Sequence, residues 1–144
     1  LTTHHQRCRQ LAAALTRSPM LTLRVLPASY AIWQLPCDAP LPAWPDGAFV
    51  CVIRTANELS GVCASNMTPA GAVVDDGWRC LQFMGAFDLT LTGIMVRVAQ
   101  PLATAGVPIF TLATYNTDYI LVPSSRYAEA VVALTAAGHQ IVVE

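Results

Sequence analysis

The stretch that most constrains this chain is residues 107–122, where two apolar, β-branched segments flank a polar centre. That centre reads Thr114-Tyr115-Asn116-Thr117-Asp118. The pattern predicts two buried strands joined by a tight turn. Just upstream, residues 85–93 lead into a helical pattern. Polar residues confined to a turn between core strands, beside a helix N-terminus, favour a small-ligand site at this place.

Helix and strand periods on both sides extend this hairpin into a β-α-β-β-α-β unit. Residues 78–84 read as a strand, and apolar residues then recur at helical spacing over 94–105. We expect Thr90 or Thr92 to cap that helix, Pro101 to kink or loosen it, and Gly106 to end it. A second helix over 123–138 and a last strand over 139–143 complete the order. This is the ferredoxin-like arrangement of an α/β (α+β) fold, which we expect to be built on an antiparallel sheet.

The first half of the chain reads differently, as a strand-rich partial unit. Apolar runs predict strands over 21–26, 30–35, 48–54 and 58–64, with a stiff proline-containing loop over 36–47 and a polar loop over 65–77. Residues 1–17 read as a helix. The predicted division is therefore an N-terminal helical extension (1–20), a partial half (21–72) and the complete unit (73–144). Gly61 lies inside a strand, which marks close approach by another backbone or by a ligand.

Composition restricts the partners of the chain. Hydrophobic residues make up 54% of the sequence and charged residues 12%, so much of the surface is apolar and a homodimer is the simplest way to cover it. The net charge of −1 comes without a basic stripe, which argues against nucleic acid. No apolar run reaches the roughly 20 residues of a membrane span, and no secretory signal is visible, so we expect no membrane partner and a cytoplasmic location.

Neither metal nor cofactor chemistry is predicted. The five cysteines are scattered, and three lie in apolar strand-like runs, so we expect reduced, buried thiols. His4, His5 and Cys8 have a spacing that could hold a metal on one helical face, but nothing nearby completes the site. Nucleophile, phosphate-cradling and dinucleotide motifs are absent from the sequence, so no catalytic residue and no enzyme activity are predicted.

Four segments resemble a known family: Phe87-Asp88, Thr92-Gly93-Ile94, Pro101-Leu102-Ala103 and residues 113–122. They are similar to the ACT-domain subfamily that includes the cytosolic arginine sensors of animals and many short bacterial proteins. The resemblance extends over residues 21–140 and is densest after Trp78. The sensors carry tandem copies of the unit, whereas this chain has room for one. The resemblance implies an ACT fold and a regulatory protein that binds an amino acid at a unit or subunit interface.

The resemblance also implies a set of ligand-binding residues. In the sensors a Glu-Leu-Ser-Val-like run lines the site from the neighbouring unit, and residues 58–62 correspond to it, with Gly61 as a departure. The backbone N–H groups of Gly93 and Ile94 suit a ligand carboxylate, and Asp118 suits an ammonium group. The full expected set is Glu58, Ser60, Gly61, Val62, Phe87, Asp88, Thr92, Gly93, Ile94, Thr114, Asn116, Thr117 and Asp118.

Simpler roles for the three carboxylates remain open. Asp88 could cap the first helix, Asp118 could stabilise its turn through a side-chain bond, and Glu58 could be an exposed carboxylate at a strand end. Two kinds of function follow: a sensor of an amino acid or a similar small zwitterion, or an ACT-like dimerisation or docking module without a ligand. No carboxylate pair is placed for a guanidinium, so arginine is not implied as the ligand.

Overall fold

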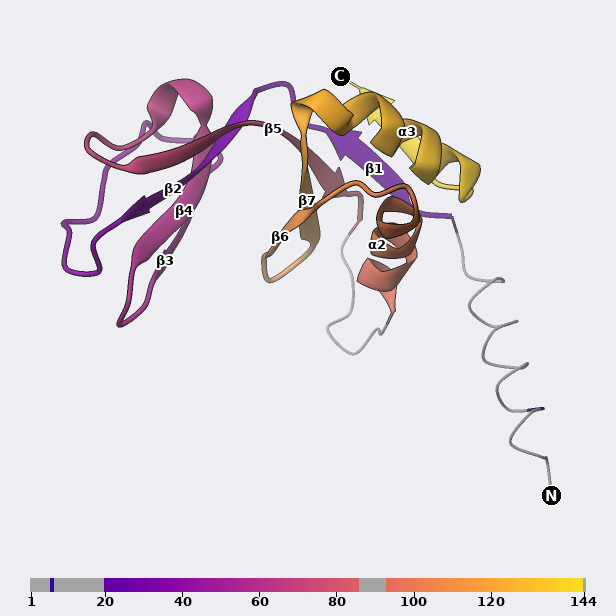
Figure 1. The fold of residues 1–144 in the computed structure, drawn as a ribbon, viewed down its shortest axis with the longest axis horizontal. Helices are drawn as coiled ribbons and strands as arrows, with labels where there is room; N and C mark the ends of the chain where they lie inside the picture. Colours follow the sequence, from indigo (N-terminus) through magenta and orange to yellow (C-terminus); the bar gives the residue numbers. More distant parts are fainter. Residues whose placement is uncertain (1–5, 7–19, 86–92, 144) are drawn as a thin grey trace.

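The structure, a computed structural model, describes residue 6 and residues 20–85 and 93–143 (Figure 1). The strands are β1 (Thr22–Val25), β2 (Tyr30–Leu35), β3 (Cys51–Arg54), β4 (Leu59–Ala64), β5 (Val73–Phe83), β6 (Phe110–Ala113), β7 (Asp118–Pro123) and β8 (Gln140–Val143). The helices are α2 (Ile94–Thr104) and α3 (Tyr127–Ala136), with 3-10 turns η1 (Ser65–Met67) and η2 (Ser124–Arg126). Each strand and helix predicted after residue 20 is therefore present. The helix predicted over 1–17 lies outside the described residues.

Strand β5 organises the sheet because it belongs to both halves of the molecule. Its first part pairs with β2, which leads through β4 to the edge strand β3. Its second part lies between β7 and β1, and β7 in turn pairs with β6. These pairs are antiparallel, as predicted, and the α+β ACT-like fold is confirmed.

Strand β1 corrects one detail of the predicted topology. It lies between β5 and β8, antiparallel to the first and parallel to the second. The expected antiparallel sheet thus contains a parallel pair. The insertion is possible because β1 and β2 follow the same edge of β5 one after the other, with a bend at residues 26–29 between them.

The start of β5 also differs from the prediction. Residues 73–77 were expected to belong to a loop, because Asp75, Asp76 and Gly77 are typical of turns. They form the first part of β5 instead, and the side chains of residues 73–76 are exposed. Gly77 has a φ of 84°, and the pairing with β2 shifts register between Tyr30 and Ile32. The turn-like residues therefore mark an irregularity inside a long strand.

Helices α2 and α3 cover one face of the C-terminal sheet (Figure 1). Alternate residues of β1, β5 and β7 point into this helix-side core, where they meet Val98 and Leu102 of α2 and Ala130 and Leu134 of α3. Both helices end in Schellman motifs: Gly106 and Gly138 take positive φ, and the N–H groups of the next residues bond back to Leu102 and Leu134. The two predicted helix ends are confirmed.

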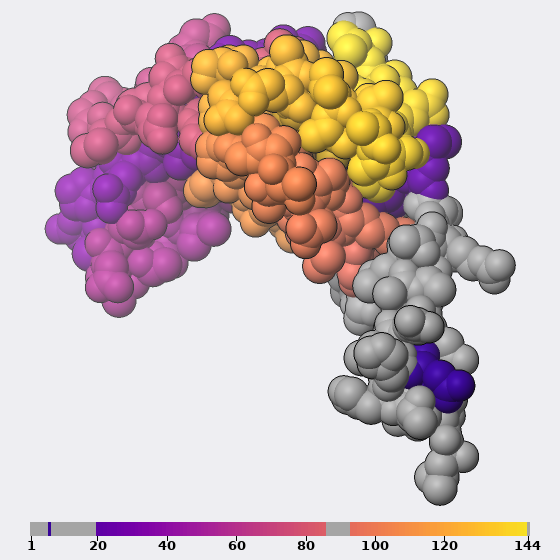
Figure 2. Space-filling view, turned by 45° about the vertical axis from the view of Figure 1, so that its right-hand side comes forward, coloured from indigo at the N-terminus to yellow at the C-terminus, as the bar shows by residue number. Residues whose placement is uncertain are grey.

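The opposite face of the sheet packs against the N-terminal half. A second core joins Tyr30, Val62, Cys80 and Leu121. The ring of Phe49 lies 5.5 Å from that of Tyr30 and 5.0 Å from that of Tyr119, centroid to centroid. Figure 2 shows the N-terminal strands and the C-terminal helices as two adjoining parts of one body.

The cysteines of the described part carry free thiols: Cys37, Cys51, Cys63 and Cys80. Cys63 and Cys80 are buried, as predicted. Burial raises the pKa of the Cys80 thiol to about 12. Within the described residues, no helix is long and apolar enough to cross a membrane.

Candidate functional site

The polar turn between β6 and β7 is closed by two threonines. The Thr114 N–H donates to the Thr117 carbonyl over 2.8 Å. The Thr114 hydroxyl donates to the same carbonyl at 3.1 Å and accepts from the Thr117 N–H at 3.2 Å. Tyr115 and Asn116 are left at the exposed tip, where the Tyr115 side chain is 83% accessible. The predicted tight turn is confirmed, and the Thr114 hydroxyl serves the turn itself.

Thr117 also fixes the turn to the sheet. Its buried hydroxyl donates to the Phe83 carbonyl over 2.6 Å. Phe83 is the last residue of β5. The hairpin tip is therefore held beside the point where β5 ends and the chain leaves toward α2.

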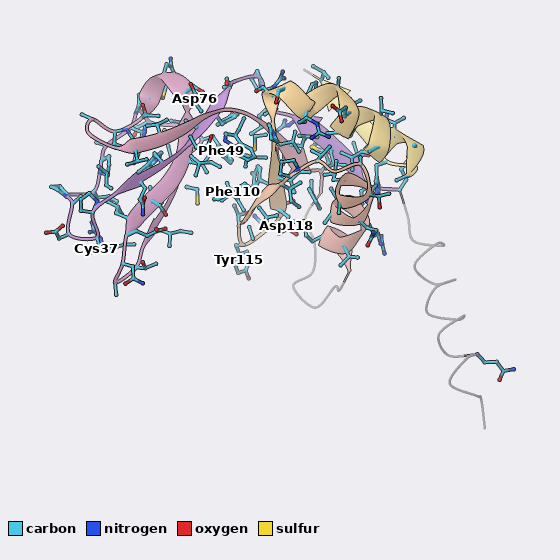
Figure 3. All side chains as sticks on the ribbon, in the orientation of Figure 1. Cys37, Phe49, Asp76, Phe110, Tyr115 and Asp118 are labelled. Atoms are coloured by element: carbon cyan, nitrogen blue, oxygen red, sulfur yellow. The ribbon has the colours of Figure 1, made fainter. Side chains whose placement is uncertain are left out.

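Asp118 follows this turn and faces the helices. Side chains alternate along a strand, and Ile120 and Val122 of β7 belong to the helix-side core, so Asp118 lies on the same face. Figure 3 shows it close to Tyr115 at the hairpin end. Among the described residues, the Asp118 carboxylate makes no hydrogen bond. The turn is closed instead by the bonds between Thr114 and Thr117, and not by a side-chain bond of Asp118.

Helix α2 begins at the same end of the sheet. Gly93 is its N-cap, with a φ of 78°, and no side chain of the described residues caps it. The expected threonine cap is therefore wrong in position: the left-handed conformation at the N-cap requires glycine. Ile94, the first helical residue, packs against the helix-side core. Phe87, Asp88 and Thr92 lie outside the described residues.

The predicted site residues at the start of β4 and within it lie in the N-terminal half, between β3 and β2. Glu58 accepts from Gln34 Nε2 and from the Ser60 hydroxyl, each over 2.9 Å. Val62 is buried in the second core. Gly61 meets the β3 backbone, because an added Cβ would lie 2.0 Å from the Cys51 carbonyl oxygen. Strand β2 separates β4 from β5, so the single chain does not bring this group to the hairpin end.

The described residues show no metal-binding arrangement. They contain no group of three or more His, Cys, Asp or Glu that could hold an ion. Burial, followed by the neighbouring Cys80, raises the pKa of Tyr30, and burial raises those of Cys51 and Cys63. Tyr30 and Cys51 belong to the second core between the two halves, and Cys63 belongs to a cluster inside the N-terminal half. Their perturbation reflects packing, not convergence on a reaction centre.

Comparison with known proteins identifies the family of this fold. The family model of the ACT domain matches residues 73–136. A second model, which describes an N-terminal domain, matches residues 28–71. The chain is 38% identical to a protein from Agrobacterium tumefaciens of known crystal structure, with a TM-score of 0.81, and the match covers 88% of this chain and 96% of that one. The chain belongs to the ACT-domain family.

More distant structures share the ACT fold. A protein from Vibrio cholerae, described as a possible transport protein, is 18% identical with a TM-score of 0.64, over 85% of this chain and 91% of that one. The regulatory subunit of aspartate kinase from Thermus thermophilus is 10% identical with a TM-score of 0.58, over 80% and 95%. No curated protein sequence matches the chain.

Sequence reasoning missed one residue that positions elements of this ACT domain. His139 is buried and bonds to backbone groups of two other elements. Its place directly after the glycine that ends α3 was the available signal, because such a residue has a fixed backbone position. The Thr117 tether was also missed as a structural role, since a threonine in a turn does not reveal which carbonyl it reaches.

Proposed function

We propose that this ACT protein binds a free amino acid and regulates a partner through that binding, without catalysis of its own. The observation that carries the proposal is the combination of Asp118 and the N-terminus of α2 at one end of the sheet. Asp118 offers a carboxylate with no partner among the described residues. The first turn of α2 offers backbone N–H groups that no described side chain caps.

These two features have opposite charges. A helix N-terminus carries roughly half a positive charge and favours anions. An ionised Asp accepts hydrogen bonds only, and charge-assisted bonds to it are stronger than neutral ones. A free amino acid carries one carboxylate and one ammonium on the same carbon. Its carboxylate would accept from the N–H groups of Gly93 and Ile94, while its ammonium would donate to Asp118.

A second copy of the chain would complete the site. Glu58 and Ser60 belong to the run that lines the site from a neighbouring unit in the related sensors, yet within one chain β4 lies away from the hairpin end. Two large apolar side chains of α2 and α3 are exposed to solvent, Val96 at 56% and Val132 at 69%. An open hollow of about 470 Å³ lies beside Val132. Burial of these side chains favours a homodimer.

Calorimetry of the Asp118→Asn variant tests the binding mode. A thermal-shift screen of the common amino acids first identifies a ligand of the wild type, since a ligand at 100 times its Kd stabilises by about 2.7 kcal/mol. Loss of the charge-assisted bond in Asp118→Asn should cost about 2–5 kcal/mol of binding, which is thirtyfold or more. One of the two exposed carboxylates of β5 gives the matched control, Asp75→Asn, which should bind as the wild type does. Equal affinity in both variants would remove Asp118 from the site.

Mixed dimers test the contribution of the second copy. If Ser60 of one copy completes the site of the other, Ser60→Ala and Asp118→Asn subunits should form hybrids with one intact site. Binding would then reappear on mixing the two weak variants. Absence of recovery in verified hybrids, or a monomer in light scattering across the micromolar range, contradicts the shared site. A dimer that binds no amino acid would instead favour a docking module without a ligand.

A further inference from the structure

A hydrogen-bond relay connects the N-terminus of α2 to β1 through a buried histidine. The Arg97 N–H donates to the Gly93 carbonyl over 3.3 Å. The Arg97 carbonyl lies 3.1 Å from Nε2 of His139. Nδ1 of the same ring lies 3.3 Å from the Leu21 nitrogen. The relay therefore runs from the N-cap of α2 to the residue that precedes β1.

The backbone geometry fixes the tautomer of His139. The Leu21 N–H can only donate, so Nδ1 must accept. The ring proton then lies on Nε2, which donates to the Arg97 carbonyl. His139 is 8% exposed, and its bond to Leu21 is buried while its bond to Arg97 is partly buried. A neutral imidazole is the form of histidine that makes both bonds at once.

Pro101 explains why α2 needs a donor from outside the helix. Residue 101 is four positions after Arg97, where an α-helix would donate its N–H to the Arg97 carbonyl. Proline has no N–H, and its ring crowds that carbonyl. The helix resumes afterwards, because the Ala105 N–H donates to the Pro101 carbonyl over 3.1 Å. His139 thus supplies the bond that Pro101 removes.

The backbone on the other side of the ring is equally fixed. The His139 N–H donates to the Leu134 carbonyl over 3.0 Å in the Schellman motif of α3. The next residue, Gln140, donates to the Leu21 carbonyl over 2.9 Å and starts the pairing of β8 with β1. The ring is therefore held between α3 and the sheet before it reaches α2. His139 therefore connects the end of α3 and the sheet to the first turn of α2.

We propose that His139 is a positioning residue for ligand binding, which sets the N-terminal turn of α2 relative to the sheet by bonding the carbonyl at the Pro101 break. The ligand part of this inference rests on the proposed function, in which Gly93 and Ile94 hold the ligand carboxylate. The positioning part concerns the protein alone. It predicts that the effects of substituting His139 and Pro101 are coupled, because the His139 bond is needed only while Pro101 leaves the Arg97 carbonyl without a backbone donor.

A double-mutant design with hydrogen exchange tests the coupling without any ligand. In His139→Leu, amide exchange in peptides covering residues 94–100 should rise about tenfold, because a buried hydrogen bond is lost. Exchange in β5 and β7 should change much less. Adding Pro101→Ala should restore protection, since the amide introduced at position 101 can donate to the Arg97 carbonyl. His139→Gln retains a side-chain N–H donor and should lie between the wild type and His139→Leu.

The matched control separates this repair from general stabilisation of the helix. Thr104→Ala also raises the helix propensity of α2, but it gives the Arg97 carbonyl no new donor, so it should not rescue His139→Leu. Rescue by both substitutions, rescue by neither, or an equal rise of exchange across the whole sheet in both His139 variants would overturn the inference.

Affinity measurements then distinguish the proposed amino-acid binding from the proposed positioning role of His139. Each common amino acid is added singly to wild type, His139→Leu and the double variant His139→Leu/Pro101→Ala. Affinity should fall about tenfold in the single variant and return in the double variant. If no amino acid binds the wild type while the exchange pattern holds, the proposed function fails and the positioning role stands. If the exchange pattern fails while the wild type binds, the reverse holds.

Discussion

The two places that the sequence marks for a ligand differ in what their polar groups already do. Directly before β4, Glu58 accepts from Gln34 of β2 and from Ser60 of β4 in the same chain. At the end of the C-terminal sheet, Asp118 has no such partner among the described residues, and α2 begins without a described side-chain cap. Both places carry a carboxylate near a turn. Among the described residues, the carboxylate of Asp118 therefore has no partner, whereas that of Glu58 is engaged by β2 and β4.

Polar side chains also hold the loops of the N-terminal half. Arg54 donates to the carbonyls of Cys37 and Ala39 and so ties down the proline-containing loop. The indole N–H of Trp44 donates to the Met67 carbonyl over 2.9 Å. The N-terminal half therefore uses its polar side chains to hold itself together. We expect substitutions there to change stability first, and substitutions at the hairpin end to change binding first.

The largest expected effect is that of Gly61→Ala. An added Cβ would lie 2.0 Å from the Cys51 carbonyl oxygen and 2.7 Å from a ring carbon of Trp33. Both neighbours are packed, so strand β3 must move away, and unfolding free energy should fall by about 3 kcal/mol or more. Urea unfolding measures it. Ser60→Ala, one residue away, is the control and should cost well under half as much; equal costs would mean that Gly61 is not the point of close approach.

Thr117→Val should have a smaller effect on stability but a clear effect at the hairpin end. It removes the buried bond from the hydroxyl to the Phe83 carbonyl while it keeps the shape of the side chain. Unfolding free energy should fall by about 1–2 kcal/mol, and ligand affinity should fall because the turn that carries Asp118 is no longer held to β5. The exposed β6 residue Thr111 gives the control Thr111→Val, which should leave both unchanged. Loss of stability with unaltered affinity would separate the turn from the site.

Most of the fold follows from patterns that are local in the sequence. Strand and helix periods, the glycines that end the helices and the hairpin over 107–122 all depend on neighbouring residues, and each is present in the structure. Which strands pair is not a local property. Periodicity gave no reason to place β1 between β5 and β8, because a short alternating strand fits any sheet edge with the right face buried.

The site was predictable only in part, for a similar reason. The polar turn and the helix N-terminus are sequence features, so their placement at the same end of the sheet followed from the order of the elements. What each side chain bonds to did not. Thr117 could have faced a ligand, but its hydroxyl is used by the Phe83 carbonyl. For His139, the place after Gly138 indicated a fixed backbone position but not its partners, which are 42 and 118 residues away in the chain.

The smallest expected effect is a pH dependence in the N-terminal half. A hydrogen bond from the Ser65 hydroxyl, and then one from the Gly77 N–H, lowers the pKa of the Asp76 carboxyl. A lowered pKa means that the folded state favours the ionised form. The contribution to stability is therefore present above the ordinary pKa of 3.8 and is lost as the pH falls through the lower, folded value.

The pH dependence of stability should change with substitutions in the polar network of Asp76 and Ser65, and not with a substitution in β6. Urea midpoints measured from neutral pH to below pH 4 should decline more in the wild type than in Asp76→Asn, which has no proton to gain. Ser65→Ala removes the larger cause of the shift and should flatten the same acid limb, while Thr111→Val should keep the limb of the wild type. Because Asp76 is almost fully exposed, water screens its bonds and the difference should be small. An acid limb of equal steepness in wild type and Asp76→Asn would mean that other carboxylates govern the acid unfolding, and that the bonds between Asp76, Ser65 and Gly77 add nothing to the stability of this half.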